Sequence, residues 1–321
     1  MELKQGYKQT EVGVIPEDWS VISMDTITTH IGDGLNGTPV YSPNGEYFFI
    51  NGNNLNDGKI VITIDTKSVD RSEFIKHQKP INERSILMSI NGTVGNLGLF
   101  DGEQVLLGKS AAYLNLKPNT SKQFLYHSLQ TKIVKQQFFD GLTGSTIGNL
   151  GLATIRQTQI PIPPTKVEQE AIAEALSDAD ALIESLEQLI AKKRQIKQGA
   201  MQDLLTSKKR LPGFSEEWEV KTLGEIANIK TGSINNQDKI EDGEYPFFVR
   251  SYTIERINSY SHDCEAILVP GEGGIGSIFH YINGRFNVHQ RVYAITKFPE
   301  NISGRFVFYY MVKNFGSVVS G

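Results

Sequence analysis

The sequence predicts an α+β protein in which two homologous domains with irregular, mostly antiparallel sheets are joined by one long coiled-coil helix. Three observations predict this fold: an internal repeat, short β-rich segments bounded by turn residues, and one long segment with a heptad pattern of apolar residues. A chain of 321 residues is long enough for two domains that each have a hydrophobic core.

The internal repeat consists of four stretches that recur in the same order. The only two tryptophans, Trp19 and Trp218, occupy equivalent positions in it. The matched pairs are 15–21 with 214–220, 45–49 with 243–248, 86–95 with 267–276, and 121–126 with 303–308. Chance could produce one such match, but four in order indicate a duplication. The last two residues align with Thr143 and Gly144, so ~65 residues of the first copy have no counterpart in the second.

Within each copy, short strands and a few helices are expected. Residues 59–64 and 84–90 are β-rich and are bounded by Asn-Gly or Asp-Gly turns. Glycine and asparagine are frequent between the predicted strands, as turns require. We expect shorter helices over 121–139 and 304–315.

Residues 165–209 have a different character. They contain no proline, and Gly199 is their only glycine. Apolar residues alternate in spacings of four and three, which predicts the a/d seam of a coiled coil: Ile172, Leu176, Ala179, Ile183, Leu186 and Ile190. The prolines at 163–164 and 212 mark where this helix begins and ends. Since a single helix cannot bury this seam, we expect a partner helix. The predicted domains are therefore 1–164 and 210–321, with a spacer helix over 165–209.

The junction before this helix resembles a known family. Ile160-Pro161-Ile162-Pro163-Pro164, followed by Glu168-Gln169, resembles the passage from recognition domain to helix in the specificity subunits of type I restriction–modification enzymes. Residues 207–226 resemble that family's entry into its second recognition domain, and residues 37–39 resemble a loop near the start of its first. The resemblance covers nearly the whole chain. It implies two target-recognition domains, each followed by a long helix, with the two helices packed antiparallel as a spacer.

The resemblance also implies a function and partners. The chain would be a non-catalytic subunit that binds a bipartite target in double-stranded DNA. It would scaffold two modification subunits, which are adenine-N6 methyltransferases, and two ATP-driven restriction subunits. The chain itself would hold no cofactor, because S-adenosylmethionine, ATP and magnesium would belong to the partners. The sequence departs from the family pattern in lacking the end of the second recognition domain and the second spacer helix.

That departure leaves alternatives open. The missing helix would come from sequence beyond residue 321, or from a second copy that pairs its 165–209 helix in trans. A truncated fragment acting as a homodimeric DNA reader is one rival. A coiled-coil scaffold whose domains bind protein is another.

The candidate DNA contacts are polar residues in loops that follow predicted strands. Lysine and arginine suit guanine or phosphate, and asparagine and glutamine suit adenine. In the first domain we select Asn91, Thr93, Lys109, Ser110, Ser145, Thr146 and Asn149. In the second we select Arg250, Ser251, His289, Gln290 and Arg291, with 289–291 as the first choice. The alternative for each residue is a solvated turn residue.

Charge and composition limit the other functions. A net charge of −4 disfavours an indiscriminate nucleic-acid binder, so positive charge must be local or supplied by partners. Cys264 is the only cysteine, which excludes an intramolecular disulfide and a thiolate metal cluster. No apolar run is long enough for a membrane span or a secretory signal, so we expect a cytoplasmic protein without membrane partners.

Two motifs and the histidines resemble nucleotide-binding or metal-binding patterns, but the surrounding residues do not fit such sites. Residues 271–276 fit G-x-G-x-x-G, yet the following residues predict a strand and an Asn283-Gly284 turn instead of the required helix. Residues 108–110 resemble the end of a phosphate-binding loop but lack its earlier glycine. The six histidines are scattered without metal-ligand spacing. The sequence therefore predicts no catalytic set, metal or nucleotide site in this chain.

Overall fold

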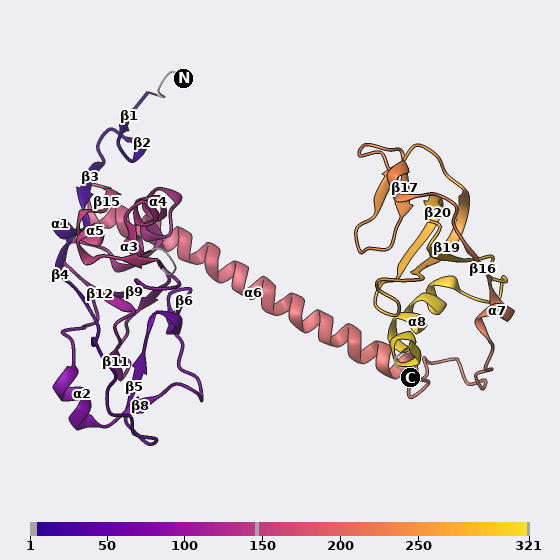
Figure 1. Ribbon diagram of the computed structural model, residues 1–321, viewed down its shortest axis with the longest axis horizontal. Coiled ribbons are helices and arrows are strands. Elements are labelled where there is room, and N and C mark those ends of the chain that lie inside the picture. Colours follow the sequence, from indigo (N-terminus) through magenta and orange to yellow (C-terminus); the bar gives the residue numbers. More distant parts are fainter. Residues whose placement is uncertain (1–4, 145–147, 320–321) are drawn as a thin grey trace. The chain divides into compact units, whose positions relative to one another are not determined.

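The longest element is α6 (Lys166–Leu204), a helix of 39 residues. Thr165 caps its start, because its hydroxyl accepts a hydrogen bond from the Glu168 N–H at 3.2 Å. The helix ends before Ser207, whose left-handed φ of 57° cannot continue an α-helix. The predicted helix over 165–209 is thus confirmed, with an end five residues earlier. The structure is a computed structural model that describes residues 5–144 and 148–319 (Figure 1).

Contacts divide the chain into two units, Met1–Ser185 and Leu186–Gly321. This division falls inside α6. The boundaries predicted at its two ends therefore stay a prediction. These two units are called the first and the second domain.

The first domain is built on two sheets. The larger sheet is entirely antiparallel, with the order β10-β9-β12-β4. The smaller has the order β11-β5-β8, and its β11–β5 pair is parallel. Their strands are β4 (Thr28–Asp33), β5 (Tyr47–Ile50), β8 (Ser68–Val69), β9 (Ser85–Ser89), β10 (Leu97–Leu99), β11 (Val105–Leu107) and β12 (Ala111–Leu116).

Shorter elements surround these sheets. The paired strands are β1 (Tyr7–Thr10) with β2 (Gly13–Pro16), β3 (Ser20–Ser23) with β15 (Gln159–Ile162), β6 (Leu55–Asn56) with β7 (Lys59–Ile60), and β13 (Leu142–Thr143) with β14 (Asn149–Leu150). The helices are α1 (Met24–Ile27), η1 (Gly52–Asn54), α2 (Arg71–His77), α3 (Lys122–Leu129), α4 (Lys132–Asp140) and α5 (Leu152–Gln157).

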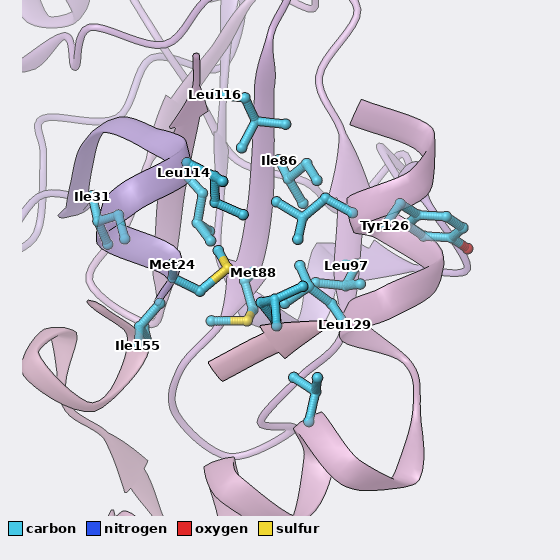
Figure 2. Close-up of a cluster of buried hydrophobic side chains, with 14 of the residues drawn as sticks. Met24, Ile31, Ile86, Met88, Leu97, Leu114, Leu116, Tyr126, Leu129 and Ile155 are labelled. Carbon is cyan, nitrogen blue, oxygen red and sulfur yellow. The ribbon is translucent and has the colours of Figure 1, made fainter. Parts of the chain in front are cut away.

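The main core of the first domain lies between its larger sheet and the helices. Ile86 and Met88 of β9 and Leu114 of β12 are fully buried there, facing Leu129 of α3. Figure 2 shows these side chains together with Met24 and Ile155 from α1 and α5. Ala173 of α6 belongs to the same core, so the first turns of α6 pack on this domain.

The second domain is built on one six-stranded sheet with the order β16-β21-β19-β20-β17-β18. Phe248, Phe286 and Val288 fill its core, and Val307 and Met311 of α8 pack against Ile267 and Ile295. Its elements are α7 (Leu223–Ile226), β16 (Asn228–Thr231), η2 (Asn236–Asp238), β17 (Tyr245–Phe248), β18 (Glu255–Ile257), β19 (His262–Pro270), β20 (His280–Val288), β21 (Val292–Thr296) and α8 (Gly304–Val319).

The two domains share one topology. The order β20-β19-β21-β16 matches β10-β9-β12-β4, and β20-β17-β18 matches β11-β5-β8, including the parallel pair. The nine-residue β20 takes the places of both β10 and β11. Trp19 packs edge-on against Phe124, and Trp218 packs edge-on against the equivalent Phe306. The predicted α+β fold with duplicated, mostly antiparallel domains is confirmed.

Three predicted elements need correction. Residues 59–64 pair only at Lys59 and Ile60, and Ile64 is fully exposed, because no neighbouring strand continues beyond the short β6. The helix predicted over 121–139 is broken, since Thr131 caps α4 through its hydroxyl. Asn283 and Gly284 lie inside β20, paired with Glu265 and Cys264, and do not form a turn. The strand after the G-x-G-x-x-G segment is confirmed as β20.

No helix within residues 5–144 and 148–319 is both long and apolar enough to cross a membrane.

Candidate nucleic-acid interface

In the first domain, the predicted residues gather at one end of the larger sheet. Ser89 at the end of β9 lies opposite Ala111 at the start of β12, so the loops 90–96 and 108–110 are neighbours. Asn91 forms a β-bridge with Asn149, which brings a third segment to the same place. The Thr93 and Ser89 hydroxyls lie 3.2 Å apart. Lys109 is exposed in the second loop. Ser145 and Thr146 lie outside the described residues.

The structure adds one segment that the sequence analysis missed. The Ser110 hydroxyl accepts from the Gly52 N–H at 2.9 Å and donates to Asn51 Oδ1 at 3.1 Å. A Cβ on Gly52 would lie 2.2 Å from Ser89 Oγ, so only glycine permits this approach. The sequence feature that could have indicated this segment is the run of asparagines and glycine at 51–54, which directly follows a β-rich stretch.

In the second domain, the corresponding end of the sheet carries a cluster of charged side chains. Pro270 and Val292 pair as Ser89 and Ala111 do. Arg291 Nη1 lies 2.5 Å from Glu272 Oε1, and Arg250 Nη1 contacts the same oxygen. A cavity of about 280 Å³ opens here, lined by Thr231, Gly271, Glu272, Gln290, Arg291 and Tyr293. The hydrogen bond from Arg291 and the positive charges of both arginines lower the pKa of Glu272. The carboxylate is therefore ionised at neutral pH.

His289 has a supporting position beneath this cluster. Its side chain is only 4% exposed, and its Nδ1 accepts a hydrogen bond from the Arg291 N–H at 3.0 Å. Burial, and then the two nearby arginines, lower its pKa, so the ring is neutral and can accept this bond. This burial disfavours the direct DNA contact that the sequence suggested for His289. The residue instead fixes the turn that presents Arg291.

The remaining two predicted residues lie on the surface of the same end. Gln290 donates to Asn235 Oδ1 at 2.6 Å, and the Ser251 hydroxyl donates to the Thr253 carbonyl at 2.9 Å. The second domain thus brings together all five predicted residues. Glu272 is the member that the sequence analysis missed, since a search for DNA-binding side chains favours cations and amides over carboxylates.

The equivalence of the two clusters follows from backbone pairing. The Gly108 N–H donates to the Ile50 carbonyl at 2.7 Å, and the His289 N–H donates to the Phe248 carbonyl at 3.0 Å. Counting from these bonds, Ser110 corresponds to Arg291 and Gly52 to Arg250. By the same count from the strand ends, Asn91 in the first domain corresponds to Glu272 in the second. These three equivalent positions are therefore uncharged in the first domain and charged in the second.

The predicted seam of α6 is buried only at its start. Ile172 packs against the core of the first domain, while Leu176, Ile183 and Leu186 are 44%, 55% and 48% exposed. Ala179 and Ile190 are also exposed. The apolar face from residue 176 onward is accessible to a partner helix, and pairing of this face stays a prediction.

Comparisons with known proteins agree with this architecture. The family model described as type I restriction modification DNA specificity domain matches residues 16–196 and again 215–318. The chain is 28% identical to the putative type I restriction enzyme MjaX specificity subunit of Methanocaldococcus jannaschii, over 96% of this chain and 79% of that protein. It is 26% identical to a putative type I specificity subunit of Mycoplasma genitalium, S.MgeORF438P, over 64% of this chain and 51% of that protein.

A solved structure has the same fold. The crystal structure of the S subunit of a type I restriction–modification system from M. genitalium superposes with a TM-score of 0.65 at 20% sequence identity, over 100% of this chain and 80% of that chain. The two family-model matches cover most of the chain and coincide with its two domains of shared topology. The chain therefore belongs to the type I restriction–modification DNA specificity family, whose role is the recognition of DNA sequence.

Proposed function

We propose that this chain directs a type I restriction–modification complex to a bipartite DNA target, with one half-site read by each domain. The observation that carries the proposal is the repetition of one polar loop cluster at the same end of two equivalent sheets. Loops at a sheet end can place side chains on base edges, while neighbouring contacts to phosphate fix the register. The helix α6 links the two domains in the chain and would set the length of the unread gap.

The proposal assigns catalysis to partner subunits. Two modification subunits would bind S-adenosylmethionine, and two restriction subunits would bind ATP and magnesium. This chain would contribute DNA recognition and the surface on which the partners assemble. The support is its family membership, because the family model is defined by DNA specificity.

Selection from a random duplex library tests the function. The chain is mixed with its modification subunits, bound duplexes are enriched through several rounds, and the products are sequenced. We expect a motif with two defined parts separated by a fixed undefined gap. Enrichment of no motif would remove the DNA-reading function and leave the protein-binding scaffold as the alternative.

A second candidate, a homodimeric reader, is favoured by the exposed apolar face of α6. Two copies could bury this face against each other, as a heptad seam requires. The test is the mass in solution of the wild type, of Leu186→Glu, and of Glu187→Gln as a control on the exposed polar face. The homodimer predicts that only Leu186→Glu becomes a monomer. A monomeric wild type would reject it.

A further inference from the structure

The cluster of Arg250, Glu272 and Arg291 has an unusual composition for a surface that binds DNA. Two guanidinium groups converge on a single carboxylate oxygen, Glu272 Oε1. All three side chains remain accessible, with exposed fractions of 42%, 43% and 55% for Arg250, Glu272 and Arg291. Glu272 and Arg291 line a cavity of about 280 Å³ at the end of the sheet. The cluster is therefore both preorganised and open to a ligand.

The chemistry of this cluster matches a guanine–cytosine pair. The bond from Arg291 to Glu272 uses Nη1 and leaves further N–H donors of the planar guanidinium for O6 and N7 of guanine. A carboxylate is the acceptor suited to the N4 amino group of cytosine. A carboxylate also repels phosphate, so it disfavours binding of the arginines to the DNA backbone in any register. Arginine alone would fit guanine or phosphate, whereas arginine with glutamate favours the base pair.

Two further contacts favour Arg291 over Arg250 as the arginine that would contact a base. Its backbone N–H is held by buried His289, so the start of its side chain is fixed. Arg250 leaves a different loop and reaches the same oxygen of Glu272 from there. Arg250 is therefore placed to orient the carboxylate, which would leave guanine recognition to Arg291. Both roles use geometry that already exists without DNA.

We infer that Arg291 and Glu272 read a guanine–cytosine pair in the half-site of the second domain, with Glu272 as a specificity-determining residue and Arg250 as a positioning residue. The inference rests on the proposed function. The equivalent positions of the first domain are Gly52, Asn91 and Ser110, which carry no charge. These three positions of the first domain therefore cannot read a guanine–cytosine pair in this way. Asn91, at the position equivalent to Glu272, suits adenine instead.

The test repeats the library selection with the full chain and its modification subunits, using Glu272→Gln, Arg291→Lys and the control Glu300→Gln. Glu300 is an exposed glutamate of the same domain. We expect the wild-type motif to contain a guanine–cytosine pair in one half. Glu272→Gln and Arg291→Lys should each reduce the preference for that pair by about five-fold to a hundred-fold, because one good base contact is lost. The other half of the motif and the control should not change.

Three results would overturn the inference, and they differ from failure of the proposed function. The first is a two-part wild-type motif without a guanine–cytosine pair in either half. The second is an unchanged preference at every position in both variants. The third is an equal loss of preference in both halves, which would indicate weaker binding and not altered base reading. A wild type that enriches no motif would instead reject the function itself, and the inference with it.

Discussion

Gln169 is a single buried amide that attaches α6 to the first domain. Its side chain is 4% exposed, and its Oε1 accepts the Ser121 N–H at 3.0 Å. Gln169→Ala would leave that buried N–H without a partner, so we expect a loss of about 1–3 kcal/mol in the free energy of unfolding of this domain. Urea unfolding followed by Trp19 fluorescence, in a Trp218→Phe background, measures it. Gln188→Ala, on an exposed part of the same helix, should change stability by less than about 0.5 kcal/mol. Equal effects of the two substitutions would contradict this role.

His127 makes the same attachment sensitive to pH. Its Nε2 lies 3.1 Å from the Ser177 hydroxyl on α6, and burial lowers its pKa from the usual 6.5, against a smaller opposing effect of Asp180. Because the unfolded chain binds this proton more readily, stability falls as the pH drops below 6.5 and stops falling below the folded-state pKa. Unfolding of the Trp218→Phe chain between pH 7.5 and 5.5 should show this loss. His127→Gln should make the pH dependence weaker, and an unchanged slope would exclude His127 as its source.

At the level of residues, the sequence predicted which loops come together better than which of their side chains are exposed. Turn residues after β-rich segments indicated the loops that carry the candidate side chains, and these loops meet at one sheet end in each domain. Sequence proximity could not separate His289, which is buried, from Arg291, which is exposed, because burial depends on the packing of β17. The pairing of Glu272 with Arg250 joins loops from different strands, and no local pattern encodes it.

At the level of elements, one glycine in each domain permits the close approach of two chain segments. A Cβ on Gly34 would lie 2.2 Å from the Gly108 carbonyl oxygen, and one on Gly232 would lie 1.9 Å from the Val288 carbonyl oxygen. Since backbone atoms would have to move, Gly34→Ala and Gly232→Ala should each destabilise their own domain by about 1–3 kcal/mol. Thermal unfolding monitored by the tryptophan of each domain checks this.

Gly199→Ala provides the matched comparison, because no atom lies within 4 Å of a Cβ at this position in α6. Alanine should stabilise the helix there by about 0.5–1 kcal/mol. A neutral or stabilising effect of Gly34→Ala or Gly232→Ala would show that the close approach tolerates a side chain at that position.

Elements with strong periodic patterns were the most predictable. The heptad seam and flanking prolines located α6 to within a few residues. A β-rich stretch without a partner strand along its whole length was predicted poorly. Residues 59–64 have β-branched side chains but pair only where β6 lies beside them. Asn283-Gly284 has the composition of a turn, yet the long pairing of β19 with β20 keeps it extended. Tertiary pairing overrides local preference in both cases.

At the level of the whole molecule, α6 would act as the ruler between the half-sites. Seven residues inserted between Leu189 and Ile190 keep the heptad phase and add about 10 Å of helix. At ~3.4 Å per base pair, we expect the unread gap of the selected motif to lengthen by about three base pairs. Both half-site sequences should stay the same. A gap of unchanged length would show that α6 does not set the spacing.

Because β20 is one continuous strand, the two domains should differ in how cooperatively their sheets unfold locally. In the first domain, β10 and β11 are separate strands with a loop between them, so either sheet can open while the other stays paired. In the second domain, the single strand β20 pairs with both β17 and β19, so the loss of one pairing should also destabilise the other. Amide hydrogens along β20 should therefore exchange as one cooperative group, whereas those of β10 and β11 should exchange at two different rates.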